Sequence, residues 1–325
     1  MPTLPLWRLR ATSLIAAGIV MAVNTGCRAA RAEAREGNDA ATASAARSRA
    51  VNWAEVDAAI GRAGVIQPGD VHRYNFPRSD LTVTVRDPGG DVVLRPALAL
   101  GGWLAMHEVG AGNEVMAMGD LVLTEDELPR VMSRLQEGGV EQTAVHHHVM
   151  RESPRVLYMH LHARGDAVKI AQTVRAAVAL TATPAAVAAA APVPVALDTT
   201  AIAAALGHTG RSNGGVYQVS APRPETITAD GHPIPGSMGL GTVMNFQPTG
   251  NGRAAITGDF VMTAGEVNRV IRALRANGIE VTSLHNHMLD DEPRLFFMHF
   301  WANDDAVKLA RGLRAGLDST AIRPR

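Results

Sequence analysis

Residues 258–278 read GDFVMTAGEVNRVIRALRANG, and this stretch decides the fold. Its apolar start predicts the end of a strand. Thr263 and Glu266 then have the spacing of a capping box, which opens an amphipathic helix. Gly278 is placed to end that helix, because glycine readily adopts the left-handed conformation that follows a helix C-terminus. Residues 119–139, GDLVLTEDELPRVMSRLQEGG, repeat the same arrangement and indicate an internal duplication.

The duplication extends well beyond the helix. Residues 119–181 align without a gap onto residues 258–320 at a constant shift of 139, and about 26 of the 63 positions are identical. Self-similarity of this length is typical of tandem domains. We therefore expect a first repeat domain at residues 50–181 and a second at 195–325. The Ala- and Pro-rich segment 182–194 has the composition of a linker between them.

The strands and helices expected in the second repeat have a mixed order. Strands are predicted at residues 242–247 and 254–262, before the helix, and at 279–288 and 295–302, after it. A last helix is predicted at 306–317, with an aspartate as its N-cap. The order ββαββα predicts the α+β class, with a mainly antiparallel sheet and two helices packed on one face. The other face would remain for solvent or for a site.

The first 27 residues have the pattern of an export signal. Arg8 and Arg10 precede an apolar run at residues 11–23, as in a signal peptide. The run is shorter than the roughly 20 residues that span a bilayer. Gly26 and Cys27 close the segment and resemble a bacterial lipobox, in which the cysteine is lipidated.

We therefore expect a signal peptide at residues 1–27, lipidation at Cys27 and a flexible tether at 28–49. The protein would then be held at the membrane, in the periplasm or cell envelope. The alternative is cleavage near Ala30, which would leave a soluble secreted protein. Lys+Arg and Asp+Glu both number 31, so the chain lacks the basic excess typical of nucleic-acid binding.

Histidines carry the chemistry suggested by the sequence. The two strands after the first helix hold three equivalent histidines in each repeat: His146, His148 and His160, then His285, His287 and His299. Alternate residues of a strand point to one face, so the histidines of each His-x-His motif should project together. A hairpin centred near Glu292 would place His285 opposite His299. Three neutral imidazoles with an open fourth position suit Zn²⁺ or Cu²⁺.

Further candidates lie beside these histidines. His162 could add a fourth ligand in the first repeat, where the second has Trp301, and His147 lies within the His-x-His motif. The capping box accounts for Glu266 without any function. A turn role is favoured over a ligand role for Asp120 and Asp259, which each follow a repeated glycine at the end of a strand. Two alternative interpretations of the histidines are a pocket that binds a small ligand without metal and a purely structural polar cluster.

Three motifs of the second repeat resemble the LppY/LpqO family of bacterial predicted lipoproteins, which is built on a domain of unknown function. They are LHNHM at residues 284–288, EPRLFF at 292–297 and MHFW at 298–301. The resemblance covers roughly residues 50–320. It implies an exported, often lipid-anchored protein and supplies no catalytic residues. The first repeat departs from the motifs at His147, Ser153 and His162, so one site could be altered or inactive.

Three functional classes follow from these patterns. The first is an exported protein with a His-lined pocket for a metal or small ligand in each repeat. The second is a metal-dependent hydrolase, in which a three-His zinc site lowers the pKa of a bound water. The third is a non-catalytic envelope module that interacts with a partner.

Overall fold

The computed structural model describes residues 50–185 and 192–323. The expected signal peptide (1–27) and its tether (28–49) lie outside the described residues, as does the middle of the expected linker. Within the described ranges, none of the helices combines the length and the apolar character that a membrane crossing needs. Residues Arg49–Arg325 form one compact unit, which contains both repeats.

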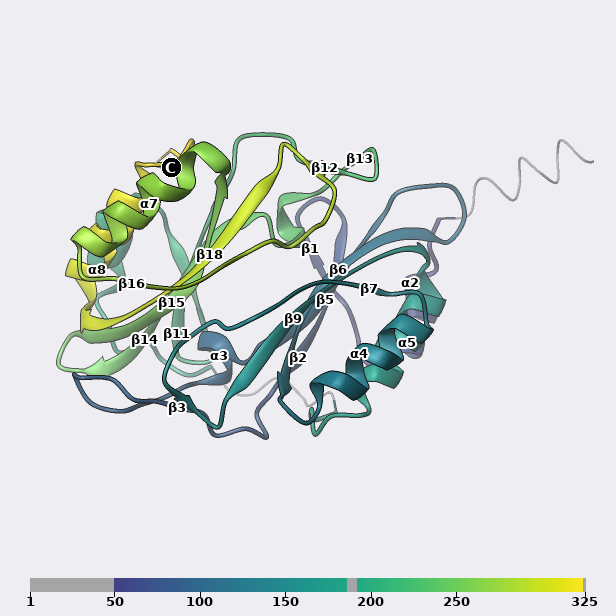
Figure 1. Cartoon of the computed structure of the whole chain (residues 1–325), viewed down its shortest axis with the longest axis horizontal. Helices are drawn as coiled ribbons and strands as arrows, with labels where there is room; N and C mark the ends of the chain where they lie inside the picture. The colour runs from purple at the N-terminus through teal and green to yellow at the C-terminus, as the bar shows by residue number, and fades with distance from the viewer. Residues whose placement is uncertain (1–49, 186–191, 324–325) are drawn as a thin grey trace, which may run out of the picture. The chain divides into compact units, whose positions relative to one another are not determined.

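The first repeat is built on a six-stranded sheet of order β1-β2-β5-β6-β9-β7, with antiparallel neighbours throughout. Figure 1 shows α2, α4 and α5 gathered on one face of this sheet. The bounds of its elements are α2 (Trp53–Ile60), β1 (Val65–Gln67), β2 (Val71–Pro77), β5 (Gly101–Glu108), β6 (Glu114–Thr124), α4 (Leu128–Glu137), β7 (Glu141–His146), β9 (Val156–Asp166) and α5 (Ala167–Val178).

The second repeat has the same topology, with strand order β10-β11-β14-β15-β18-β16. In Figure 1, α7 and α8 lie side by side over one face of its sheet. The bounds are α6 (Thr199–Leu206), β10 (Gly210–Asn213), β11 (Val216–Pro222), β14 (Gly241–Gly250), β15 (Arg253–Thr263), α7 (Ala264–Ala276), β16 (Glu280–His285), β18 (Leu295–Asp305) and α8 (Ala306–Leu317). The expected duplicated α+β class is confirmed.

Local signals in the sequence explain where the helices begin. Thr263 and Glu266 form the complete capping box at the start of α7. Asp305 caps α8 by accepting a hydrogen bond from the backbone N–H of Lys308, and Asp166 caps α5 in the same way. These side chains satisfy N–H groups that the first helical turn leaves unpaired. The last helix of each repeat, α5 or α8, therefore begins at the same kind of aspartate cap.

Two small sheets were not expected. They have strand orders β4-β3-β8 and β13-β12-β17, and each holds a short strand of the β7–β9 or β16–β18 connection. Their strands, with two short helices, are β3 (Thr84–Val85), β4 (Val92–Val93), α3 (Pro96–Ala99), β8 (Glu152–Ser153), β12 (Thr228–Ala229), β13 (His232–Pro233), η1 (Gly236–Met238) and β17 (Asp291–Glu292). The connection between the strands expected at residues 279–288 and 295–302 therefore contains a short strand of its own, β17.

Each sheet buries both of its faces. The helix-bearing faces form one core per repeat, with Met159 in the first and Met298 in the second. On the other faces, Trp103 and Met116 of the first repeat pack in one cluster with Phe297 of the second. A further cluster joins side chains of both repeats in the same way. The face expected to stay free for solvent or a site is covered by the other repeat.

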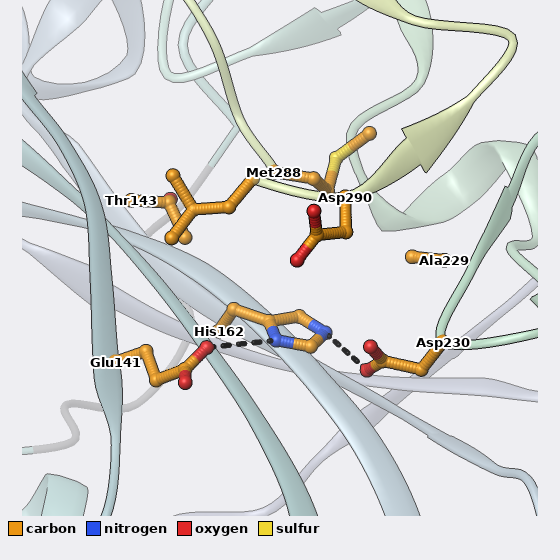
Figure 2. Close-up of a pocket in the computed structure, with 8 residues that line it drawn as sticks. Glu141, Thr143, His162, Ala229, Asp230, Met288 and Asp290 are labelled. Carbon is orange, nitrogen blue, oxygen red and sulfur yellow. Dashed lines mark ion pairs between the residues drawn. The ribbon is translucent and has the colours of Figure 1, made fainter.

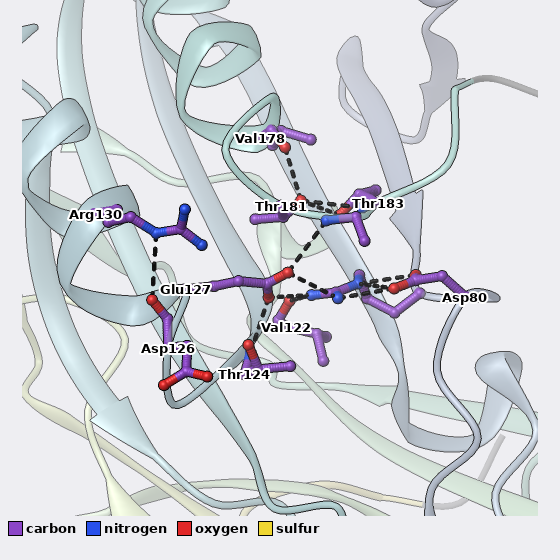
Figure 3. A network of polar contacts seen from close by, with 11 residues as sticks. Asp80, Val122, Thr124, Asp126, Glu127, Arg130, Val178, Thr181 and Thr183 are labelled. Atoms are coloured by element: carbon purple, nitrogen blue, oxygen red, sulfur yellow. Dashed lines mark hydrogen bonds and ion pairs between the residues drawn. The ribbon is translucent and has the colours of Figure 1, made fainter.

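In each repeat a buried ion pair connects a glutamate at the start of α4 or α7 with an arginine that directly follows β2 or β11. Arg78 is 1% exposed, and its guanidinium donates to both oxygens of Glu127 at 2.7 and 3.1 Å. Figure 3 shows Glu127 within this network of polar contacts. Burial favours a higher pKa for Glu127, but hydrogen bonds from Arg78 and from the backbone of Thr124 and Ala182 hold the pKa below its ordinary value.

Glu266 has the same arrangement in the second repeat. Its carboxylate accepts hydrogen bonds from Arg223 and from the backbone N–H groups of Thr263 and Ala321. Burial again opposes a lower pKa, and these bonds again hold the pKa of Glu266 below its ordinary value. The structure gives Glu266 a structural set of partners and does not bring it together with the histidines.

Candidate metal centre

The six repeated histidines form a single cluster, to which both repeats contribute. His146 and His285, which are equivalent in the two repeats, stack with ring centroids 3.8 Å apart. His160 lies 3.8 Å from His287, and His148 lies 3.8 Å from His299. Each of these contacts joins one repeat to the other. One pocket per repeat was expected, and the structure instead shows one shared centre.

The strand pairing differs from the expected register by two residues. Ser283, and not His285, lies opposite His299, and His285 pairs with Phe297. Ala144 takes the equivalent place opposite His160 in the first repeat. A shift by an even number of residues keeps side chains on the same face. The predicted pair was therefore wrong, whereas the rings still face the same side.

The third histidine of each repeat, His160 or His299, has its ring orientation set by a backbone carbonyl group. His299 Nδ1 lies 2.6 Å from the carbonyl oxygen of Gly258, and His160 Nδ1 lies 3.1 Å from that of Gly119. A carbonyl can only accept, so Nδ1 carries the proton and donates it. Nε2 of each ring then has its lone pair directed into the cluster, which is the tautomer that metal-bound histidines adopt.

The glycines that orient these rings are themselves required by packing. A Cβ atom on Gly258 would lie 1.9 Å from the carbonyl oxygen of Val243. A Cβ atom on Gly119 would lie 2.6 Å from that of Trp103. Any side chain would therefore push the neighbouring strand away. The repeated glycine before each aspartate thus keeps the sheet closed beside the cluster.

The repeated aspartates belong to the cluster. Asp259 Oδ2 lies 3.0 Å from His287 Nε2, and Asp120 Oδ2 lies 3.3 Å from His148 Nε2. Asp259 lies within β15, opposite His299, so the expected turn role is wrong. Burial raises the pKa of Asp259 to about 6, and it raises the pKa of Asp120 well above its ordinary value.

The histidines are neutral at ordinary pH. Burial is the main reason that the pKa of each of the six lies below its ordinary value, and it lowers the pKa of His287 to about 3. Neighbouring rings lower the pKa of His146 and His285 further, because two adjacent imidazolium charges would repel each other. Neutral imidazole is the form that binds metal ions.

Many polar atoms of the cluster have no hydrogen-bond partner among the described residues. Both ring nitrogens of His285 are buried and unpaired in this way, and so are Nδ1 of His146 and Nε2 of His160. The same holds for Oδ1 of Asp120 and of Asp259. An unpaired buried polar group costs about 1–3 kcal/mol. The arrangement is therefore costly for a purely structural role.

Three sets of side chains are arranged so that they could hold a metal ion, with ligand atoms within 4.8 Å of one another. Two of the sets draw on both repeats. The sets are His146, His285 and His299; His160, His285 and His287; and Asp120, His146 and His160. Sets of three nitrogens, or of two nitrogens and a carboxylate, are typical of Zn²⁺ and Cu²⁺ sites.

Two further sequence candidates lie outside the cluster. His162 lines a separate cavity of about 20 Å³, with ring nitrogens 3.8 Å from Glu141 and 3.7 Å from Asp230 (Figure 2). His147 is about one third exposed and lies 3.9 Å from Glu152. The turn role favoured for Asp120 is wrong as well, because Asp120 lies within β6 opposite His160. The convergence of both repeats on one centre was missed.

Similarity to solved structures is weak. EtuB from Clostridium kluyveri matches with 10% identity and a TM-score of 0.18, over 78% of this chain and 89% of EtuB. The trimeric bacterial microcompartment shell protein PduB matches with 14% identity and a TM-score of 0.19, over 79% of this chain and 91% of PduB. The double ringed trimeric shell protein MSM0271 from the RMM microcompartment matches with 11% identity and a TM-score of 0.18, over 65% and 85%. Scores this low support no argument about fold or function.

The search of curated proteins gave no match. The family described as Domain of Unknown Function (DUF1259) matches residues 54–180 and again residues 200–319. These two regions correspond to the two six-stranded sheets with their helices. The chain therefore belongs to the Domain of Unknown Function (DUF1259) family and carries its domain twice.

Proposed function

We propose that this protein binds a transition metal ion, Zn²⁺ or Cu²⁺, in the histidine cluster shared by its two repeats. The observation that carries the proposal is the convergence of six imidazole rings, three from each repeat, in one buried cluster. Two of the rings, His160 and His299, are already oriented by backbone carbonyls so that Nε2 faces the cluster. Such outer hydrogen bonds fix ligand geometry before the metal arrives.

Enclosure favours binding over catalysis. His146, His160, His287 and His299 are each at most 7% exposed. A catalytic zinc site keeps an open position for water and has room for a substrate. Two cavities in the described part of the chain are lined by residues other than these six histidines. The proposed activity is therefore metal binding, and hydrolysis is the less favoured alternative.

The unpaired ring nitrogens favour a metal over a metal-free polar cluster. Both nitrogens of His285 lack a hydrogen-bond partner among the described residues, although the ring is largely buried. A metal-free structural cluster would be expected to pair these atoms with protein groups. Coordination to an ion would compensate several of them at once. A small organic ligand would need a cavity beside the rings.

The proposed cellular location of the protein rests on the sequence alone. Arg8, Arg10 and the apolar run before Cys27 support export and lipid anchoring, and the resemblance to the LppY/LpqO family supports the same reading. We infer a membrane-attached protein of the periplasm or cell envelope. The test is membrane fractionation of a Cys27→Ser variant. The variant is expected in the soluble fraction, and its full retention on the membrane would contradict the anchor.

Metal analysis tests the proposed activity. Purified protein is loaded with Zn²⁺ or Cu²⁺, dialysed and analysed for metal, beside a His146→Ala/His285→Ala variant. Wild type should retain about one ion or more per chain, and the variant should retain almost none. His147→Ala is the matched control, because His147 lies in the same motif but outside the cluster. Wild type that retains no more metal than the double variant would contradict the proposal.

A further inference from the structure

The small cavity around His162 differs in chemistry from the rest of the protein. Glu141 and His162 come from the edge of the first sheet, and Asp230 and Asp290 come from loops of the second repeat. Figure 2 shows the carboxylate of Asp290 turned toward the imidazole ring. The cavity of about 20 Å³ is large enough for one water or ion. Among the residues that line it, three are acidic and none is lysine or arginine.

His162 is an unusual member of this acidic wall. The residue is only 9% exposed, and its Nε2 atom has no hydrogen-bond partner among the described residues. The nearest oxygen of Asp230 is 3.7 Å away, which is too far for a hydrogen bond. A buried imidazole nitrogen without a hydrogen-bond partner, facing carboxylates across a space of one ion, is a cation ligand in chemical type.

This cavity lies directly beside the histidine cluster. Thr143 lines the cavity, and its hydroxyl donates to the backbone carbonyl of His287 at 2.7 Å. His287 belongs to the cluster, and Asp290 follows it by three residues on the same loop. A cation held in the cavity would therefore be one short loop away from the proposed metal centre.

The duplication supplies a second, equivalent position for comparison. Thr282 donates to the carbonyl of His148 at 2.6 Å, as Thr143 does to that of His287. At this second position, Arg151 stands where the first has Asp290, and it pairs with Glu280 at 3.0 Å. Trp301 replaces His162 and donates its indole N–H to Asp87 at 2.9 Å.

The two equivalent positions have therefore diverged in charge. Arg86 follows β3 as Asp230 follows β12, so two acids at one position correspond to two arginines at the other. At the arginine-containing position, Arg151 pairs with Glu280 and the indole of Trp301 pairs with Asp87. Among the described residues, no lysine or arginine pairs with the carboxylates of the acidic position. Clefts lined by one sign of charge concentrate ions of the opposite sign.

We propose that the cavity lined by Glu141, His162, Asp230 and Asp290 is the entry site for the metal ion. A divalent transition-metal cation binds there first, through His162 Nε2 and the aspartate carboxylates, and then passes to the shared histidine cluster. The equivalent arginine-containing position is closed to cations. This inference rests on the proposed function, because the cation is the cargo of the histidine cluster.

Loading kinetics test the entry site separately from the final site. Metal-free protein is mixed with Co²⁺, and visible absorption of the bound ion is followed by stopped flow. Asp290→Arg should slow uptake at least about tenfold, because the new arginine can pair with Glu141 as Arg151 pairs with Glu280. Asp230→Asn/Asp290→Asn should also slow uptake. The final amount of Co²⁺ per chain should equal that of wild type in each case.

Equivalent glutamates give a matched control of equal charge change. Glu141→Gln should slow uptake several-fold, and Glu280→Gln should leave the rate unchanged. Wild-type rates in Asp290→Arg, or equal slowing by both glutamate variants, would overturn the entry site while the metal centre stands. Wild type that takes up no Co²⁺ would overturn the metal centre and the entry site together.

Discussion

The Nε2 atoms of His146 and His299 lie 3.1 Å apart, although the residues are separated by 153 positions and belong to different repeats. His299 donates its Nδ1 proton to Gly258, so its Nε2 offers a lone pair toward His146. Two nitrogens bound to one zinc ion at about 2.0–2.1 Å have a similar separation. This cross-repeat contact is the basis of the shared centre.

If the two repeats share one metal centre, substitutions in one repeat alone should abolish metal binding by the whole chain. His285→Ala/His287→Ala leaves all three histidines of the first repeat intact. We expect the variant to lose most of the bound metal, because each all-histidine ligand set includes His285. The measurement is metal content per chain after dialysis. Retention of half the wild-type content would indicate two independent sites.

Metal removal should lower the thermal stability. At an ion concentration of about 100 times Kd, binding to the folded state alone contributes about 2.7 kcal/mol. With an unfolding entropy of about 2.1 cal/mol/K per residue, this corresponds to a shift in Tm of about 5 °C for a folded unit of this size. Calorimetry with and without a chelator measures it. In His146→Ala/His285→Ala, the chelator should have no effect, and an equal shift in that variant would place the metal elsewhere.

Removal of Glu127 should destabilise the first repeat strongly. Glu127→Ala leaves the buried guanidinium of Arg78 with Asp80 as its remaining acidic partner, and breaking a buried pair costs about 3–5 kcal/mol. Urea denaturation measures the free energy of unfolding. Glu137→Ala is the control, because the exposed pair of Glu137 with Arg134 should contribute about 1 kcal/mol or less. Equal effects of the two substitutions would contradict a structural role for the buried pair.

The same carboxylates predict a loss of stability in acid. The pKa values of Glu127 and Glu266 are held below the ordinary value in the folded state. The unfolded chain therefore takes up protons first as the pH falls through about 4.3. Their contribution is complete above this pH and is lost as the pH falls through the folded pKa values. Glu127→Gln/Glu266→Gln should flatten this part of the stability curve, and an unchanged slope would refute the assignment.

Much of the fold was predictable because its determinants are local and occur twice. The spacing of Thr263, Glu266 and Gly278 predicted α7, and the aspartate cap predicted α8 at the observed residues. Alternation along the strands correctly placed the two histidines of each His-x-His motif together, since His285 and His287 both lie in the cluster. The constant shift of 139 identified which histidines are equivalent.

The shared centre was not predictable, because a strand pattern defines a face and not what covers it. Trp103 and Phe297 lie on the helix-free faces, and the buried cluster that contains both appears only in three dimensions. The register error has a similar cause. Asp291 and Glu292 pair with β12, a segment too far upstream to be recognised as a partner, so the hairpin was assumed to be simpler than it is.

Anomalous scattering from crystals of the metal-loaded protein, measured at the absorption edge of zinc or copper, tests the shared centre most directly. The proposed function predicts a peak about 2.1 Å from Nε2 of both His146 and His299, with ligands from the two repeats. A metal peak bound outside the six histidine rings, or none in crystals grown from loaded protein, would contradict it.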